Sequence, residues 1–187
     1  MSGIFRDVYL LSRADASLSD LHVSALPTQN YRGGHLTAEL SFTKEISYRA
    51  SLLDAEGNTL AVCEDAPVDF KIECVRLWSA ERPYLYTLLI ETEEEVIAEK
   101  IGFRDIRISD KQELLINGVP VKLKGVNRHD THPVYGHAIP LDEIRRELLQ
   151  MKRFNVNTIR TSHYPNTSEF LRLCDEIGFY IIAESDI

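Results

Sequence analysis

Three polar stretches of the chain hold side chains that could act together on a substrate. They are "NRHDTHPVYGH" at residues 127–137, "RTSHYPN" at 160–166 and "ESDI" at 184–187, and each follows an apolar stretch. In parallel α/β proteins, chemistry collects at the carboxyl ends of the strands, because the loops that follow converge there. We therefore expect one site, built from Asn127, Arg128, His129, Asp130, His132, Arg160, Ser162, His163, Tyr164, Glu184 and Asp186.

His129 and His163 are the strongest candidates, since both lie just beyond predicted strand ends. An imidazole there can donate to a substrate hydroxyl or stabilise developing charge. The same position also suits a histidine that only takes part in a loop network. Arg160 lies inside its strand, so we expect it to pair with a buried carboxylate such as Glu184 across adjacent strands.

The other polar residues give weaker signals. Asp130 could be an acid/base group, but a loop carboxylate followed by Thr131 is more typical of a turn. His132 and His137 are expected at exposed loop positions. Together with Asp130 or Asp186, the four histidines His129, His132, His137 and His163 could in principle bind Zn²⁺. However, H-x-x-H in a loop does not fix both rings on one face, and we expect no metal site.

A strand-helix alternation after residue 112 would position these residues. Asn117-Gly118 between two apolar runs predicts a type I′ hairpin. Strands are expected at 121–126, 157–161 and 179–184, the last of them buried on both sides. Helices are expected at 141–154 and 167–178. The order β-α-β-α-β is the beginning of a parallel α/β domain.

The two helices have predicted caps and buried faces. Asp142 and Thr167 are the expected N-caps, and Gly178 is the expected helix end. The apolar faces are Ile144, Leu148, Leu149 and Met151 in the first helix, and Phe170, Leu171, Cys174 and Ile177 in the second.

Residues before 113 follow the pattern of an antiparallel β protein. Short, partly alternating runs at 36–42, 47–54, 59–64, 68–75, 86–92 and 95–103 predict strands, separated by turn signals at Gly33-Gly34 and 56–58. This spacing predicts an immunoglobulin-like β-sandwich. Trp78 is expected to pack at a corner or edge, because Pro83 nearby cannot donate to a ladder.

Composition excludes some classes of function. The net charge is −8 with both signs interspersed, so we expect no nucleic-acid partner. No apolar run approaches the ~20 residues of a membrane span. Cys63, Cys74 and Cys174 show no metal-type spacing or disulfide framework, and a reducing, cytoplasmic location is expected. Three parallel strands do not close a barrel, and "GIFRDVYLL" reads as the tail of a preceding element, so we expect a piece of a longer protein.

The stretch 157–182, "NTIRTSHYPNTSEFLRLCDEIGFYII", closely resembles the signature of the family 2 glycoside hydrolases. The matching positions are Asn157, Arg160, His163, Tyr164, Pro165, Phe170, Leu171, Asp175, Gly178 and the run from Phe179. The form "NRHD-HP--G" looks most like the β-galactosidases of this family, whereas its β-glucuronidases usually carry Lys-His-Glu there. Asp130 is a departure, because many members have glutamate. "GIFRDVYLL" and "LWSAERPYLYTL" also resemble family segments, so the resemblance covers nearly the whole chain.

The resemblance implies a domain organisation and residue roles. Residues 1–9 would end a sugar-binding sandwich, 10–112 would form the immunoglobulin-like sandwich, and 113–187 would begin a (β/α)8 TIM barrel. His129 and His163 would contact galactose and stabilise the transition state. Structural roles near the site would fall to Asn157, Arg160, Tyr164 and Glu184.

The resemblance also implies what the chain lacks. The catalytic acid/base and nucleophile of the family are glutamates from later barrel strands, beyond Ile187, and its Mg²⁺ ligands also begin after "ESDI". We therefore expect a retaining β-galactosidase as the parent, a homo-oligomer using Mg²⁺, and an inactive fragment without a cofactor. The alternatives are a β-glucuronidase or β-mannosidase parent, or a non-catalytic binding or structural module.

Overall fold

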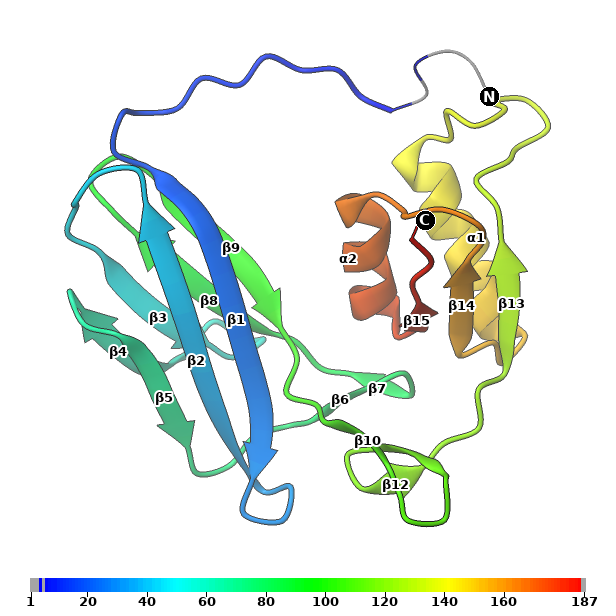
Figure 1. The fold of residues 1–187 in the computed structure, drawn as a ribbon, viewed down its shortest axis with the longest axis horizontal. Coiled ribbons are helices and arrows are strands. Elements are labelled where there is room, and N and C mark those ends of the chain that lie inside the picture. Colours follow the sequence, from blue (N-terminus) through cyan, green and yellow to red (C-terminus); the bar gives the residue numbers. More distant parts are fainter. Residues whose placement is uncertain (1–3, 5, 186–187) are drawn as a thin grey trace. The chain divides into compact units, whose positions relative to one another are not determined.

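The computed structural model describes residue 4 and residues 6–185. The chain divides into two compact units, shown in Figure 1. The sandwich unit comprises residues 12–121, and the parallel-strand unit comprises residues 122–185 together with the described residues up to Leu11. Parts of two predictions, the tail at residues 1–9 and the site residue Asp186, lie outside the described residues.

The sandwich unit contains two antiparallel sheets. One has the order β1 (Leu18–Thr28), β2 (Gly33–Phe42), β5 (Val68–Ile72), and the other β4 (Thr59–Glu64), β3 (Arg49–Leu53), β8 (Tyr86–Glu91), β9 (Val96–Ile101). Alternate side chains of both sheets fill one apolar core, which includes Leu36, Leu52, Phe70, Leu88 and Ile90. The predicted β-sandwich is confirmed, although the sequence analysis missed β1.

A short hairpin at the corner of the sandwich buries the tryptophan. β6 (Trp78–Ser79) pairs with β7 (Arg82–Pro83), and Trp78 is only 1% exposed. Its backbone N–H donates to the Phe103 carbonyl, and the Arg104 guanidinium lies over its ring. Trp78 is thus a packing residue, as predicted, and Pro83 lies in a two-stranded hairpin outside the two sandwich sheets.

A second small sheet holds the predicted hairpin. β10 (Ile106–Ile108) pairs with β11 (Leu114–Ile116), which turns into β12 (Val119–Pro120). Asn117 and Gly118 have φ of 51° and 75°, as a type I′ turn requires. The Asn117 amide donates to the Trp78 carbonyl at 3.0 Å and thereby ties the hairpin to the sandwich unit. The boundary between the units thus falls after Val121, whereas the predicted boundary lies after residue 112.

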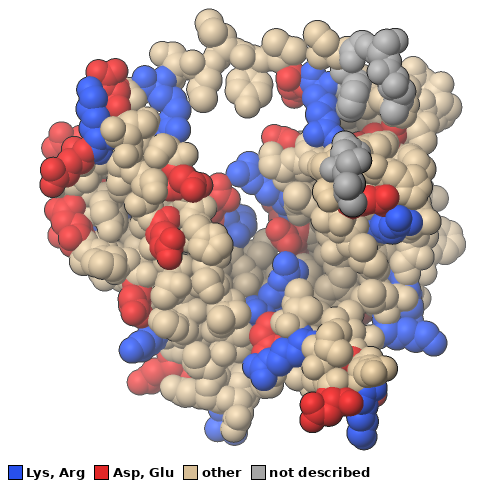
Figure 2. Space-filling model, viewed as in Figure 1, with Lys and Arg blue, Asp and Glu red and all other residues tan. Residues whose placement is uncertain are grey.

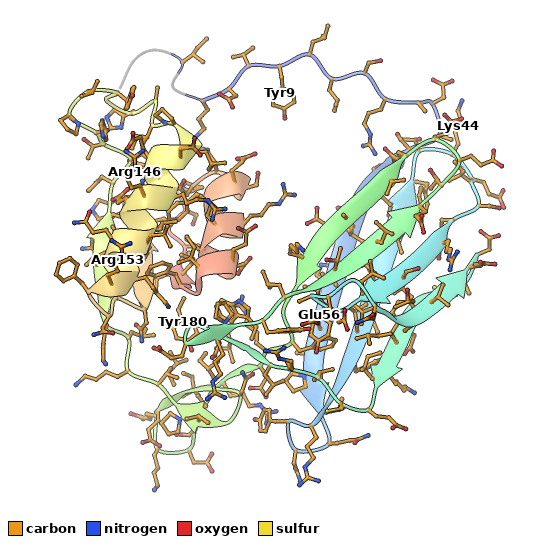
Figure 3. All side chains as sticks on the ribbon, turned by 180° about the vertical axis from the view of Figure 1, so that it is seen from behind. Tyr9, Lys44, Glu56, Arg146, Arg153 and Tyr180 are labelled. Atoms are coloured by element: carbon orange, nitrogen blue, oxygen red, sulfur yellow. The ribbon has the colours of Figure 1, made fainter. Side chains whose placement is uncertain are left out.

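The parallel-strand unit has the predicted β-α-β-α-β order. β13 (Gly125–Arg128), β14 (Thr158–Thr161) and β15 (Tyr180–Ile182) form a parallel sheet with β14 in the middle. α1 (Leu141–Arg153) and α2 (Ser168–Ile177) connect them. Figure 3 shows this unit from behind, with Arg146 and Arg153 along α1. Its core contains Ile144, Leu148, Ile159, Phe170, Leu173, Cys174 and Phe179.

The first parallel strand was predicted too early. β13 occupies residues 125–128 rather than 121–126, so Asn127 and Arg128 belong to the strand. The strand starts at Gly125, where the two backbones lie so close that a Cβ would be 2.9 Å from the Thr158 carbonyl oxygen. β15 is half-buried rather than buried on both sides, with Ile182 45% exposed.

The helix ends follow the sequence in α2 but not in α1. The Thr167 hydroxyl accepts from the Phe170 N–H, and Gly178 ends α2 at φ 92°, as predicted. The N-cap of α1 is Pro140 without a side-chain hydrogen bond, so the assignment of Asp142 was wrong. Leu149 and Leu171 are 44% and 38% exposed, whereas Leu173, absent from the predicted face, is buried.

The surface agrees with the charge pattern of the sequence. Figure 2 shows basic and acidic side chains interspersed over the visible face. None of the helices in the described ranges is long and apolar enough to cross a membrane.

Candidate functional site

The parallel register brings three of the predicted site residues to one edge of the sheet. Arg128 pairs with Thr161 and Arg160 pairs with Ile182, so the strands end nearly level. His129 follows β13, His163 follows β14 and Glu184 comes shortly after β15. The rings of His129 and His163 meet edge to face, with centroids 5.3 Å apart at 75°, and both histidines are exposed.

Glu184 holds His163 and Arg160 together. Its two carboxylate oxygens lie 2.9 and 3.0 Å from His163 Nδ1, and Oε2 lies 2.9 Å from Arg160 Nη2. The ion pair predicted between Arg160 and Glu184 is therefore present, although the Glu184 side chain is 26% exposed rather than buried. The Glu184 backbone N–H donates to the hydroxyl of buried Thr161 at 3.0 Å, which fixes the start of the third loop.

A buried arginine anchors the chain on one side of His129. The Arg128 side chain is only 2% exposed and lies over the Phe170 ring. Its guanidinium pairs with Asp130 and donates through Nε and Nη2 to Glu147 Oε2, at 3.1 and 2.9 Å. Burial works against the charged form, but the two carboxylates outweigh it and raise the pKa of Arg128.

The other side of His129 is held through Asp130. Asp130 is buried, and its backbone N–H donates to the Tyr164 hydroxyl at 2.8 Å. Its carboxylate also accepts from the Asn166 amide at 3.3 Å. Beyond the turn position expected for Asp130, its side chain belongs to a buried ion pair.

Asn157 lies at the opposite end of β14 from His163. It is buried, and its amide donates to the Lys122 carbonyl at 3.0 Å and accepts from the Lys124 N–H at 2.7 Å. Asn157 therefore joins the segment before β13 to β14. These bonds also satisfy residues 122–124, which the sequence analysis had assigned to a strand.

His132 and His137 lie outside this cluster of contacts. His132 is half-buried rather than exposed, and its Nδ1 accepts from the N–H groups of Val134 and Tyr135 at 3.1 and 3.3 Å. His137 is also half-buried. Within residue 4 and residues 6–185, no group of three or more His, Cys, Asp or Glu side chains could hold a metal ion.

Two residues that contribute to the site were not predicted from the sequence. Glu147 from α1 and Asn166 from the loop before α2 complete the contacts of Arg128 and Asp130. The only signal for Glu147 in the sequence was its place on α1 between Ile144 and Leu148, the two buried residues of the helix.

Related proteins share both the sequence and the fold. The β-galactosidase of Actinobacillus pleuropneumoniae is 45% identical over 190 residues, which cover 100% of this chain and 19% of the relative. That of Halalkalibacterium halodurans is 39% identical, covering 100% and 20%. The chain thus spans about a fifth of the length of these curated relatives.

Solved structures agree with the fold. The crystal structure of Ruminococcus gnavus β-glucuronidase in complex with uronic isofagomine superposes with a TM-score of 0.83 at 32% identity, covering 91% of this chain and 29% of the other. Residues 4–104 match the profile of glycosyl hydrolases family 2, and residues 106–187 match the TIM barrel domain of the same family. The parallel strands are thus the start of a TIM barrel, and the chain belongs to glycosyl hydrolases family 2.

Proposed function

We propose that the chain is part of a retaining β-galactosidase that hydrolyses terminal β-D-galactosides such as lactose. The observation that carries the proposal is the edge-to-face pair of His129 and His163 at the carboxyl ends of the strands, where a barrel places its chemistry. Both rings are exposed, and their neighbours are fixed by ion pairs. The identity with named β-galactosidases over the whole chain supports the choice of sugar.

In this proposal His129 and His163 contact the galactosyl group and stabilise the transition state. Arg160 and Tyr164 act through their neighbours, since Arg160 binds the Glu184 that contacts His163, and Tyr164 binds the backbone next to His129. Asn157 keeps a structural role at the other end of β14. The parent enzyme is expected to be a cytoplasmic homo-oligomer without a nucleic-acid or membrane partner.

The described carboxylates at the strand ends do not suit double displacement. A retaining glycosidase needs two carboxyl groups about 5 to 5.5 Å apart, one acid/base and one nucleophile. Asp130 is paired with Arg128, and Glu184 is held by Arg160 and His163. We therefore propose that both catalytic glutamates come from residues after Ile187, and that the 187-residue chain alone is inactive.

The carboxylates at the strand ends also do not suit Mg²⁺. The cation takes several oxygen ligands, whereas the two carboxylates at this edge already serve cationic partners or His163. We therefore propose that the Mg²⁺ ligands of the intact enzyme come from residues after Ile187.

Activity assays test the proposal. The intact parent protein should hydrolyse a nitrophenyl β-galactoside, and the purified 187-residue chain should not. Turnover by the 187-residue chain that His163→Ala abolishes would contradict the placement of the catalytic pair. Galactose binding to the 187-residue chain in calorimetry would favour the alternative of a sugar-binding module.

A β-glucuronidase is the second candidate, because the solved relatives reported above include one. The motif at residues 128–130 argues against it. Arg128 contacts Asp130 and Glu147 through separate nitrogens of its planar fork, whereas a lysine would have only one ammonium nitrogen to offer both carboxylates. Parallel assays of the intact protein on galactoside, glucuronide and mannoside substrates decide among the three. A higher kcat/KM for the glucuronide would overturn the choice of galactoside.

A further inference from the structure

We propose that Glu184 is a positioning residue that holds His163 in the tautomer protonated on Nδ1. Nε2 is then left as a hydrogen-bond acceptor for a substrate hydroxyl. The identity of that hydroxyl rests on the proposed function. The tautomer itself does not, and it can be measured without any enzymatic activity.

The contact itself determines which nitrogen carries the proton. His163 Nδ1 lies 2.9 Å from Glu184 Oε1 and 3.0 Å from Oε2. Oε2 also accepts from Arg160 Nη2 at 2.9 Å. An ionised carboxylate can only accept hydrogen bonds. Nδ1 must therefore donate, and a neutral His163 has no proton on Nε2.

Glu184 is itself held in place at two points. Its side chain binds Arg160 from the neighbouring strand β14, and its backbone N–H donates to the Thr161 hydroxyl. Thr161 is 2% exposed and belongs to the core side of the sheet. The carboxylate therefore approaches His163 from a fixed direction. Similar carboxylate-histidine contacts fix the tautomer in metal sites and in hydrolase triads.

Within the described part of the chain, the exposed His163 ring leaves its other nitrogen open to a ligand. The His163 side chain is 55% exposed, although its Nδ1 is engaged by Glu184. The ring of His129 meets it edge to face at 5.3 Å and forms the neighbouring part of the same surface. A sugar hydroxyl can donate to an unprotonated Nε2, and it could not donate to Nε2 in the opposite tautomer.

The sandwich unit provides an internal reference for this inference. His35 on β2 contacts Asp69 on β5 through Nε2 rather than Nδ1, with 2.8 Å to Oδ1. The same reasoning predicts the opposite tautomer for His35, with the proton on Nε2. One molecule thus holds two carboxylate-bound histidines with opposite predicted tautomers.

The test is a long-range ¹H–¹⁵N NMR spectrum of the ¹⁵N-labelled 187-residue chain at about pH 8.5, where imidazoles are ordinarily neutral. We expect the proton on Nδ1 in His163 and on Nε2 in His35. Glu184→Ala should shift His163 towards the Nε2-protonated form and leave His35 unchanged. Glu184→Gln keeps the size but can donate or accept, so it should give an intermediate population.

Two matched controls separate positioning from general stability. Arg160→Gln removes the ion pair but not the contact to His163, so the His163 tautomer should persist. Asp69→Ala should change His35 alone. A wild-type His163 protonated mainly on Nε2, or a tautomer that Glu184→Ala leaves unchanged, would overturn the proposal.

A kinetic measurement distinguishes this proposal from the proposed function. In the intact parent enzyme, Glu184→Ala should lower kcat/KM for galactosides by roughly 10- to 100-fold, as losses of comparable supporting contacts do. If the tautomers are as predicted but the intact protein does not hydrolyse galactosides, the proposed function fails and the positioning role stands. If the intact protein hydrolyses galactosides but Glu184→Ala leaves the His163 tautomer unchanged, the proposed function stands and the positioning role of Glu184 fails.

Discussion

The two units of the chain bury different kinds of side chain. The sandwich unit fills its core almost wholly with apolar residues, and its buried polar residues are Ser17, Ser51 and Asp105. The smaller parallel-strand unit has a shorter set of buried apolar residues, yet it also buries Arg128, Asp130, Asn157, Thr158, Thr161 and Ser162. All of these flank or belong to β13 and β14. Packing thus stabilises the first unit, whereas the second also depends on polar contacts that position His129 and His163.

The largest expected effect comes from breaking the buried ion pair. Arg128→Ala leaves Asp130 buried without its cation, and such losses cost about 3–5 kcal/mol. Circular dichroism at 222 nm follows α1 and α2 of the parallel-strand unit, whereas fluorescence of Trp78, the only tryptophan, follows the sandwich unit. In urea, the helical signal should be lost earlier and the fluorescence transition should stay in place.

Arg146→Ala is the matched control for this substitution. Arg146 pairs with Glu143 on the exposed side of α1, with 72% of its side chain exposed. Exposed pairs of this kind contribute less than about 1 kcal/mol. Equal shifts of the helical and fluorescence transitions in Arg128→Ala would show that the buried ion pair does not stabilise the parallel-strand unit separately from the sandwich unit.

The converse substitution removes apolar packing from the sandwich. Leu88 on β8 is fully buried, and a buried Leu→Ala change costs about 2–5 kcal/mol. Leu88→Ala should shift the Trp78 fluorescence transition and leave the helical transition nearly unchanged. Val62→Ala, at a position on β4 that is 48% exposed, should have little effect on either. A larger shift in the helical signal than in fluorescence would be evidence against an independent sandwich core.

A smaller effect is expected at the N-terminus of α2. The Thr167 hydroxyl accepts from the Phe170 N–H at 3.2 Å, and loss of an N-cap costs about 1 kcal/mol. Thr167→Ala should lower the free energy of unfolding of the parallel-strand unit by that amount, as measured by urea unfolding followed at 222 nm. Ser168→Ala, at the exposed first residue of α2, serves as the control. No difference between the two variants would mean that the cap does not stabilise the helix.

The smallest effect is the part of the pH dependence that Cys174 contributes to the parallel-strand unit. Burial raises the pKa of the Cys174 thiol to about 12. In the unfolded chain a thiol has a pKa of about 8.5, so the unfolded state ionises first as pH rises. The contribution of Cys174 to the free energy of unfolding is fully present below about pH 8.5 and is lost as the pH rises above it.

At pH 9 the expected loss is under about 1 kcal/mol. Comparing urea unfolding at pH 7 and pH 9 in the wild type and in Cys174→Ala measures it, because the variant should lack this part of the dependence. Cys74→Ala, at an exposed cysteine, should keep the full dependence. A pH dependence that is the same in all three proteins would rule out Cys174 as its cause.

Regular patterns made much of the fold predictable. The alternation in β2, β4 and β8, the Asn117-Gly118 turn and the Thr167 and Gly178 ends of α2 were all readable, because each depends on neighbours along the chain. β1 was missed because Ser19, Asp20, Ser24 and Pro27 obscure its alternating Leu21, Val23 and Ala25.

The site was predictable as a location but not as a set of contacts. The rule for parallel strands brought His129, His163 and Glu184 together, and it located the ion pair of Arg160. It could not indicate that Arg128 turns inward to Glu147, since that contact depends on how α1 packs across the sheet. The ion pair of Asp130 was not predicted for the same reason, because its partner is a buried cation from the neighbouring strand residue Arg128.

The central claim is that the strand ends form the sugar-contacting part of a β-galactosidase. The most direct measurement is kcat/KM of the intact parent enzyme for a nitrophenyl β-galactoside, with and without His163→Ala. The account predicts galactosidase activity in the wild type and a loss of roughly 100- to 1,000-fold in the variant, the size seen when one hydrogen-bonding group that stabilises a transition state is removed. An unchanged kcat/KM in His163→Ala, in a variant that unfolds like the wild type, would contradict the account.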